Sequence, residues 1–343
     1  MPFKPLSGRP LYASAADDRL YVPRSDVEAR IERSIERELN TLVLGERGVG
    51  KTSLLQHLLF RRREGESHRR TVHVDASIAR STLDVIDLLR EALGVAPHVG
   101  ENVAAGLRVL ARPGAAGTHD ATLLLERLSP LRDLDAAVVL LDGLVTGDIA
   151  HTLFGRMRDE LWALPLTWVV SADPNQLSQY RTPPADAFFE TIVELRPLQP
   201  SEQLDVLRRR LPAEWRLLEG LVRDDRGNPR ELLTAARQAL IENRPVEEVL
   251  RTQAARQSLA ASLGRSTSQM YAELESLGRP VAASDEELLK RLNVTRERAG
   301  QVLKRLESHG LVETFTEPAQ RGRPRKLYRV SDTLGAGETV GHI

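Results

Sequence analysis

The sequence predicts an α/β fold in which a parallel sheet is followed by a helical segment and then by a small unit of three helices and two strands. Continuous apolar runs at 136–141 and 166–170 are typical of strands buried on both faces of a parallel sheet. Residues 201–264 show helical periodicity and no strand pattern, which predicts an all-α segment. Residues 266–331 then predict a helix, a helix–turn–helix and a two-stranded ribbon.

The first strand and helix of the sheet flank a glycine-rich segment. Residues 41–44 predict a strand and 51–63 a helix, and the chain between them matches G-x-x-x-x-G-K-[ST]. Glycines let the backbone N–H groups of such a loop converge on a phosphate at a helix N-terminus, which favours anions. The lysine reaches the terminal phosphates and the hydroxyl binds Mg²⁺. The expected nucleotide-binding residues are Gly45, Glu46, Arg47, Gly48, Val49, Gly50, Lys51, Thr52 and Ser53, with Thr52 a metal ligand.

Polar residues follow two of the later strands. Asp142 ends the apolar run 136–142, at the strand end where ligands bind in doubly wound folds, and is expected to hold Mg²⁺ through water. The strand at 166–170 runs into Ser171 and Asp173. Ser171 is the better candidate for a polar group near the phosphates and Asp173 the second, while an ordinary turn after a strand is the alternative. The last strand is expected over 188–195, with Ser201 capping the next helix.

Two further segments are candidates for contact with a nucleotide. Tyr21, Val22 and Arg24 precede a helix predicted at 25–38, where they could pack beside an adenine; the alternative is an ordinary helix start capped by Ser25. A second segment begins a helix at 227–230. Its proline is suited to a first helical turn, and its arginine could reach back to a phosphate or be solvated. The candidates there are Pro229 and Arg230.

The C-terminal unit concentrates basic side chains on two elements. Its third helix, expected over 295–309, has one apolar face, and its other face carries basic and polar residues. A recognition helix in the major groove with a basic wing on the backbone is a DNA-binding arrangement, whereas a winged helix that contacts protein is the alternative. The candidates are Arg296, Arg298, Gln301, Lys304 and Arg305 on the helix and Arg321, Arg323, Arg325 and Lys326 on the wing.

Composition excludes several classes of site. The 343 residues contain no cysteine, which excludes disulfides, thiolate metal sites and cysteine nucleophiles. The eight histidines lack metal-ligand spacing. The formal net charge is zero, so any surface for nucleic acid must be local. Neither a signal peptide nor an apolar run of membrane-spanning length is recognised, and a cytoplasmic protein without membrane contact is expected.

Over residues 21–330 these motifs together resemble AAA-plus/STAND-type P-loop ATPases, and among them the origin-recognition initiators, which also end in a winged helix. The chain is expected to divide into an arm at 1–20, an ATPase core at 21–200, an all-α lid at 201–264, a winged helix at 266–331 and a tail at 332–343. The resemblance implies that ATP or ADP lies with Mg²⁺ between sheet and lid. Lys51 and Asp142 would act in catalysis, Ser171 would be the first sensor, Arg230 the second, and Arg181 an arginine finger reaching a neighbouring subunit of a homo-oligomer.

One position departs from that family. In that family, an acidic residue that orients the attacking water usually follows the aspartate that binds Mg²⁺. Gly143 occupies this position here. Asp148 is a candidate to replace the missing carboxylate, although no sequence pattern supports it. Because phosphoryl transfer depends on positioning and charge stabilisation, we expect tight ATP binding with slow hydrolysis. The main hypothesis is an ATP-dependent protein that binds double-stranded DNA. Alternatives are a regulatory ATPase of a defence or transposition module, whose winged helix binds a protein partner, and a transcription regulator with a nucleotide sensor.

Overall fold

The computed structural model describes residues 6–65, 69–95, 119–144, 147–224, 227–241, 243–292, 294–317 and 325–331. The chain divides into two compact units. Unit 1 comprises Met1–Trp215 with Val222–Glu231, and unit 2 comprises Arg216–Leu221 with Leu232–Ile343. The stretch 94–120 is rich in Gly, Ala and Pro, from which a surface excursion of unknown role is expected; it lies largely outside the described residues.

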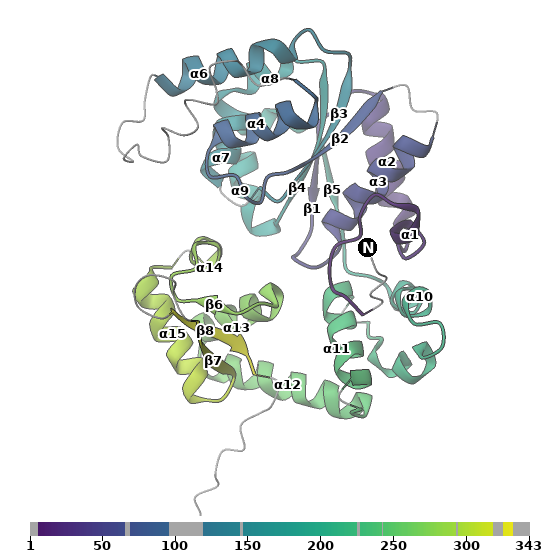
Figure 1. The fold of residues 1–343 in the computed structure, drawn as a ribbon, viewed down its shortest axis with the longest axis vertical. Coiled ribbons are helices and arrows are strands. Elements are labelled where there is room, and N and C mark those ends of the chain that lie inside the picture. The colour runs from purple at the N-terminus through teal and green to yellow at the C-terminus, as the bar shows by residue number, and fades with distance from the viewer. Residues whose placement is uncertain are drawn as a thin grey trace, which may run out of the picture. The chain divides into compact units, whose positions relative to one another are not determined.

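A five-stranded parallel sheet forms the centre of unit 1 (Figure 1). Its strands run in the order β2-β3-β4-β1-β5, so that β4 lies between β3 and β1. The last strand is shorter than expected, because a 3-10 turn at Ala185–Ala187 precedes Phe188, which is buried among Phe154 and Trp168 instead of pairing. The strands are β1 (Thr41–Leu44), β2 (Arg70–Asp75), β3 (Ala137–Asp142), β4 (Leu166–Ala172) and β5 (Thr191–Glu194).

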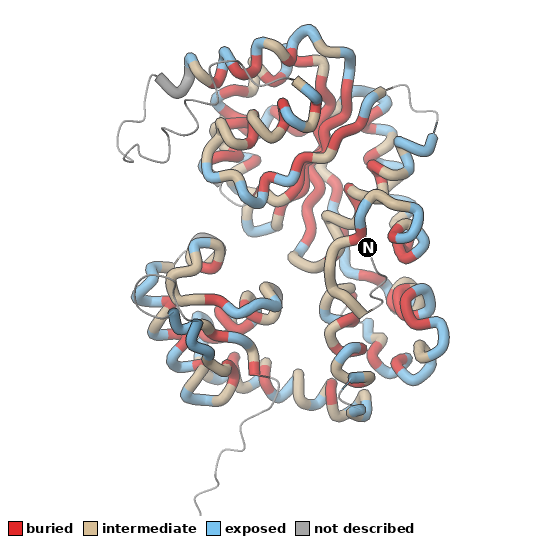
Figure 2. Tube along the Cα trace, in the orientation of Figure 1, coloured by how far each residue is buried: buried red, intermediate tan, exposed pale blue. Residues whose placement is uncertain are grey.

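Helices cover both faces of this sheet, which explains the continuous apolar runs. On one face α2 (Ser25–Glu36) and α3 (Lys51–Glu64) pack on alternate strand residues such as Val138 and Leu140. Val139 and Leu141 point to the other face, so β3 is buried along its whole length, as are β1 and β4 (Figure 2). That face is covered by α4 (Thr82–Ala92), α6 (His119–Leu128), α7 (Gly147–His151), α8 (Arg158–Trp162) and α9 (Leu177–Arg181), with short turns at Ser129–Leu131, Thr152–Arg156 and Pro174–Gln176.

The N-terminal segment packs against α3 instead of standing apart as an arm. It contains the short helix α1 (Ala15–Asp18). The backbone N–H of Leu11 donates to Ser53 Oγ at 3.1 Å, and that of Ala13 donates to Gln56 Oε1 at 3.1 Å. Leu11 is buried in the same cluster as the apolar face of α3. The segment is therefore part of the core of unit 1.

The helical stretch after the sheet is shared between the two units. It comprises α10 (Pro200–Arg210), a 3-10 helix at Trp215–Leu221, α11 (Pro229–Ile241) and α12 (Val246–Ser262). The first of these begins earlier than expected: Gln199 is its N-cap and donates its N–H to Glu202 Oε2 at 2.7 Å, so Ser201 is not the cap. α11 crosses the boundary, since Pro229–Glu231 belong to unit 1 and residues from Leu232 to unit 2.

The described part of unit 2 continues with three helices and three strands. The helices are α13 (Arg265–Leu277), α14 (Glu286–Leu292) and α15 (Arg296–Ser308); the strands are β6 (Val281–Ala282), β7 (Val312–Glu317) and β8 (Arg325–Val330), in the antiparallel order β6-β8-β7. The short strand β6 was not expected from the sequence, because two residues are too few to show the alternation typical of a strand. Its Val281 is buried with Leu303, Leu306 and Tyr328 in one core. Over the described parts of the chain, no helix combines the length and apolarity needed to cross a bilayer.

Candidate nucleotide site

The loop from β1 to α3 has the backbone that the glycine pattern predicts. Gly48 has φ +82° and Gly50 φ +108°, a left-handed region that favours glycine, and Gly50 is the N-cap of α3. Lys51 Nζ donates to Gly45 O at 2.5 Å and to Glu46 O at 3.1 Å, so the amine lies against the inside of the loop. Burial lowers the Lys51 pKa, against the opposing effect of two nearby aspartates. A bound anion here would relieve the cost of burying that cation.

Asp142 and Ser171 meet at the carboxyl ends of neighbouring strands. The Ser171 hydroxyl donates to Asp142 Oδ1, and both residues are buried. Ser171 pairs in register with Val43 of β1, so it lies between the strand of Asp142 and the strand that enters the loop. No sensor role follows from this position by itself.

The fit to Mg²⁺ rests on the donor chemistry. Asp142 and Thr52 provide a carboxylate and a hydroxyl, the oxygen ligands that Mg²⁺ prefers together with water and phosphate oxygens. Within the described ranges, no group of three or more acidic or histidine side chains could hold a metal ion. These two residues fit a metal whose remaining ligands come from phosphate and water.

Gly143 adopts a conformation that excludes the expected acidic residue. Its φ is +74°, and a Cβ built there would lie 3.0 Å from Asp75 Oδ1 and 3.0 Å from the backbone N of Ser77. Any L side chain would therefore be strained and crowded. Asp148 is exposed on α7.

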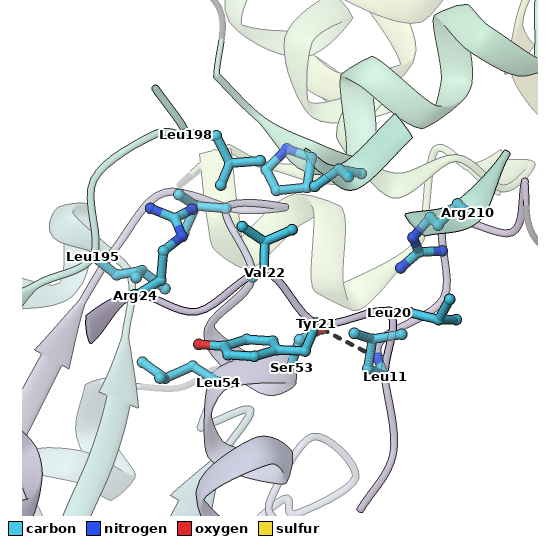
Figure 3. A pocket seen from close by; sticks show the side chains of 14 residues that line it. Leu11, Leu20, Tyr21, Val22, Arg24, Ser53, Leu54, Leu195, Leu198 and Arg210 are labelled. Carbon is cyan, nitrogen blue, oxygen red and sulfur yellow. Dashed lines mark hydrogen bonds between the residues drawn. The ribbon is translucent and has the colours of Figure 1, made fainter. Parts of the chain in front are cut away.

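A pocket opens beside the start of α3 (Figure 3). Its wall is mostly apolar, which suits a base and sugar. Tyr21, Val22 and Arg24 contribute to it. The other lining residues include Leu11, Leu20, Val49, Gly50, Ser53, Leu54, Leu195, Leu198, Val206, Arg210 and Pro229.

The side chain of Tyr21, in the wall of this pocket, makes contacts with other residues of unit 1. Its ring stacks on His57 with centroids 4.1 Å apart, and its hydroxyl donates to Glu28 Oε1 at 2.8 Å. The same carboxylate oxygen accepts the N–H of Arg24 at 2.6 Å. α2 begins at Ser25, which is therefore inside the helix and is not its cap. Tyr21 can offer a base only the part of its surface that faces the pocket.

Two arginines give the pocket positive charge. Arg24 Nη1 donates to Arg196 O at 2.9 Å, and burial lowers the Arg24 pKa. Arg210 Nη1 donates to Ser7 O at 3.2 Å, and burial lowers its pKa to about 10. Sequence reasoning missed Arg210 and the leucines of the wall, because they come from segments far apart in the chain with no shared motif.

The segment Gly227 to Arg230 contacts the phosphate loop directly. Asn228 Nδ2 donates to Arg47 O at 2.7 Å, and Asn228 Oδ1 accepts the N–H of Arg230 at 3.0 Å. A Cβ at Gly48 would lie 2.7 Å from Asn228 Oδ1. Burial and the charge of Arg47 lower the Arg230 pKa. The sequence pointed to this segment but not to Asn228. Arg181 is exposed at the end of α9.

The candidate DNA-binding residues of unit 2 lie on the surface wherever the structure describes them. Ala299, Val302, Leu303 and Leu306 face the core, as predicted. Lys326 Nζ is 2.8 Å from both Glu307 oxygens, so this cation is paired. Arg321 and Arg323 lie outside the described residues. The candidates that the structure shows to be exposed are Arg296, Arg298, Gln301, Lys304, Arg305, Arg325 and Lys326.

No family model and no curated protein sequence matches this chain. Among solved structures, the chain is similar to the Aeropyrum pernix ORC2 protein in its ADPNP–ADP complexes, with a TM-score of 0.52 at 19% identity over 93% of this chain and 94% of that one. The Aeropyrum pernix ORC1 protein in complex with DNA gives a TM-score of 0.50 at 18% identity, over 91% and 92%. The likeness shows the fold. The chain has the α/β P-loop fold that its sequence predicts.

Proposed function

We propose that this protein is an ATP-binding, slowly hydrolysing switch that couples its nucleotide state to DNA binding. The observation that carries the proposal is the loop between β1 and α3. Its left-handed glycines enclose the Lys51 amine beside the paired Asp142 and Ser171. That combination suits a triphosphate with Mg²⁺ held by Thr52 and Asp142. The adjoining apolar pocket suits the base.

Slow hydrolysis follows from the position after Asp142. The conformation of Gly143 leaves no room there for a water-orienting side chain. Lys51 and Ser171 would stabilise charge without activating water, so water activation would have to come from a carboxylate outside that position. Such a site retains its triphosphate for long periods, as a switch requires.

The contact between Asn228 and the phosphate loop supplies a route for coupling. Arg230 follows it at the start of α11, and this helix continues into unit 2. A γ-phosphate that draws in Arg230 would bias the position of α11. ATP can do so only to the extent that it binds the two positions with different affinity. Arg230 is accordingly the proposed second sensor and Ser171 the first.

The C-terminal unit is the proposed DNA-binding part, a winged helix. The exposed face of α15, with Arg298, Lys304 and Arg305, would enter the major groove, and Arg325 and its neighbours in the hairpin would contact phosphates. The DNA-bound ORC1 of similar fold supports this assignment. Assembly into a homo-oligomer, with Arg181 offered to the next subunit, is part of the same proposal.

A mobility shift on duplex DNA tests the coupling. DNA affinity of the wild type should differ at least threefold between saturating ATP and no nucleotide, and Lys51→Ala should abolish the difference. Lys304→Ala is the matched control: it should weaken DNA binding while leaving the response to ATP intact. Equal DNA affinity of the wild type with and without ATP would contradict the coupling.

One observation favours a second function, a regulatory ATPase whose C-terminal unit binds a protein. Lys326 is paired with Glu307, and Arg329 Nε donates to Glu313 at 2.9 Å, so part of the basic charge is neutralised on its own surface. Phe315 is exposed beside them. Salt separates the two functions, because DNA binding through several arginines weakens steeply with salt. Reversing Arg323 and Arg325 to Glu should abolish DNA binding but spare a protein partner.

A further inference from the structure

A second carboxylate lies beside Asp142, at the end of the neighbouring strand. Asp75 is the last residue of β2 and pairs in register with Asp142 of β3. Val72 and Val74 of β2 pack on the face of the sheet opposite α3, so the alternation of the strand places Asp75 on the α3 face.

Asp142 lies on that same face. In β3, Val138 and Leu140 pack with the apolar residues of α3, and Asp142 continues their alternation. α3 begins at Lys51, directly after the phosphate loop. Both carboxylates therefore lie on the face of the sheet that carries the phosphate loop.

The carboxylate of Asp75 also lies beside the position that a side chain at residue 143 would take. A Cβ on Gly143 would lie 3.0 Å from Asp75 Oδ1. The backbone N–H of Ser77 donates to that same oxygen at 2.9 Å, which orients the carboxylate. An acidic group is thus present after Asp142 in space, although it is absent there in sequence.

We propose that Asp75 is the catalytic residue that orients and deprotonates the attacking water. The inference rests on the proposed function. The water oxygen bonds to the γ-phosphorus, its proton passes to the Asp75 carboxylate, and the bond from the γ-phosphorus to the bridging oxygen breaks, with its electron pair leaving on ADP. The proton is then released to solvent, so that ATP and water yield ADP, phosphate and a proton.

Neither of the other aspartates near this edge has the same position. Asp148 is exposed on α7. Asp173 caps the turn at Pro174–Gln176, and its Oδ1 accepts the N–H of Asn175 at 3.0 Å. Its charge is the strongest of those that raise the Lys51 pKa, which places it toward the lysine. Asp75 is the carboxylate that meets Gly143.

Hydrolysis measured with Asp75→Asn tests this role. A positioned general base contributes roughly 100-fold or more, so the hydrolysis rate at saturating ATP should fall at least tenfold. The dissociation constant of ATP should change less than threefold, because the base acts on water. Asp148→Asn should hydrolyse ATP at the wild-type rate. An Asp75→Asn variant as fast as wild type, or an equal loss in Asp148→Asn, would overturn the inference.

A binding experiment gives a readout independent of turnover. ADP with Mg²⁺ and aluminium fluoride mimics the transferring phosphoryl group with its in-line water. The wild type and Asp148→Asn should retain this complex through gel filtration, whereas Asp75→Asn should lose it and still bind ADP. Two outcomes reject this inference and leave ATP binding untouched. One is retention of the complex by Asp75→Asn, and the other is a wild type that binds ATP but neither hydrolyses it nor traps the complex. A wild type that binds no ATP rejects the proposed function itself.

Discussion

The phosphate loop of unit 1 and the basic surface of unit 2 are both candidates for binding phosphate, but they are built differently. The loop relies on main-chain conformation and on cations whose pKa burial lowers, such as Lys51 and Arg230. The surface of α15 relies on exposed side chains, such as Arg298 and Arg305. A site made of backbone fails when one residue cannot adopt its conformation. A surface made of many exposed charges loses affinity in small steps and responds to salt.

The largest effect is expected for Gly48→Ala. The new Cβ meets Asn228 Oδ1 at 2.7 Å on a backbone with φ +82°, which costs on the order of 1–3 kcal/mol in strain and displaces the loop. Nucleotide affinity should fall about 100-fold, the upper end of that range. Isothermal titration with ATP measures it.

The matched control is Gly278→Ala in unit 2. Gly278 also has a left-handed φ, +59°, but a Cβ there would meet open space. This variant should lose thermal stability through backbone strain while ATP affinity stays within twofold. If both variants bind ATP equally well, the loop is not held by its backbone.

A smaller loss is expected for Asn228→Ala. The change removes the hydrogen bond from Asn228 Nδ2 to Arg47 O and leaves the loop carbonyl without that partner, at a cost of about 1–3 kcal/mol. ATP affinity should fall roughly tenfold, measured by titration of a fluorescent ATP analogue. Asn175→Ala, on the turn after β4, is the comparison and should change little. Unaltered affinity in Asn228→Ala would show that the contact does not support the loop.

On the basic surface, single substitutions should act more weakly. Arg298→Ala and Arg305→Ala should each weaken DNA binding roughly fivefold to tenfold and reduce the salt slope by about one. Fluorescence anisotropy with labelled duplex at several salt concentrations measures both quantities. ATP affinity should not respond. A single alanine that abolished DNA binding would mean that this surface, too, depends on one indispensable residue.

The smallest effect is expected for Glu307→Gln. Lys326 holds the pKa of the Glu307 carboxyl below its usual value, and the pair joins α15 to β8. Its stabilising contribution is present above the carboxyl's unfolded pKa and is lost as pH falls through the folded one, so the pair is intact at neutral pH. Glu307→Gln releases the lysine and should strengthen DNA binding about twofold with a steeper salt slope. Weaker DNA binding would instead assign Glu307 to the recognition surface.

Regular, local patterns determined most of the predictions that the structure confirms. The glycine pattern at 45–52 implied the loop and its helix, because phosphate-cradling backbone needs glycine at set positions. Apolar runs that lead to Asp142 and Ser171 implied two buried strands with polar residues at their carboxyl ends, and the observed strand order places these ends side by side. Amphipathic spacing in α15 separated its core face from its exposed face.

The tertiary structure alone decided which distant residues meet. Asn228 touches Arg47 across a long stretch of chain, Leu11 enters the pocket beside Ser53, and Asp75 lies against Gly143. The helical or strand periodicity of a segment does not predict such contacts, because they depend on strand order and register, which only the folded sheet establishes. Sequence therefore determined which groups this protein has for binding phosphate. The fold decided which carboxylate stands beside Asp142, since a neighbouring strand can supply a side chain that the next residue in the chain cannot.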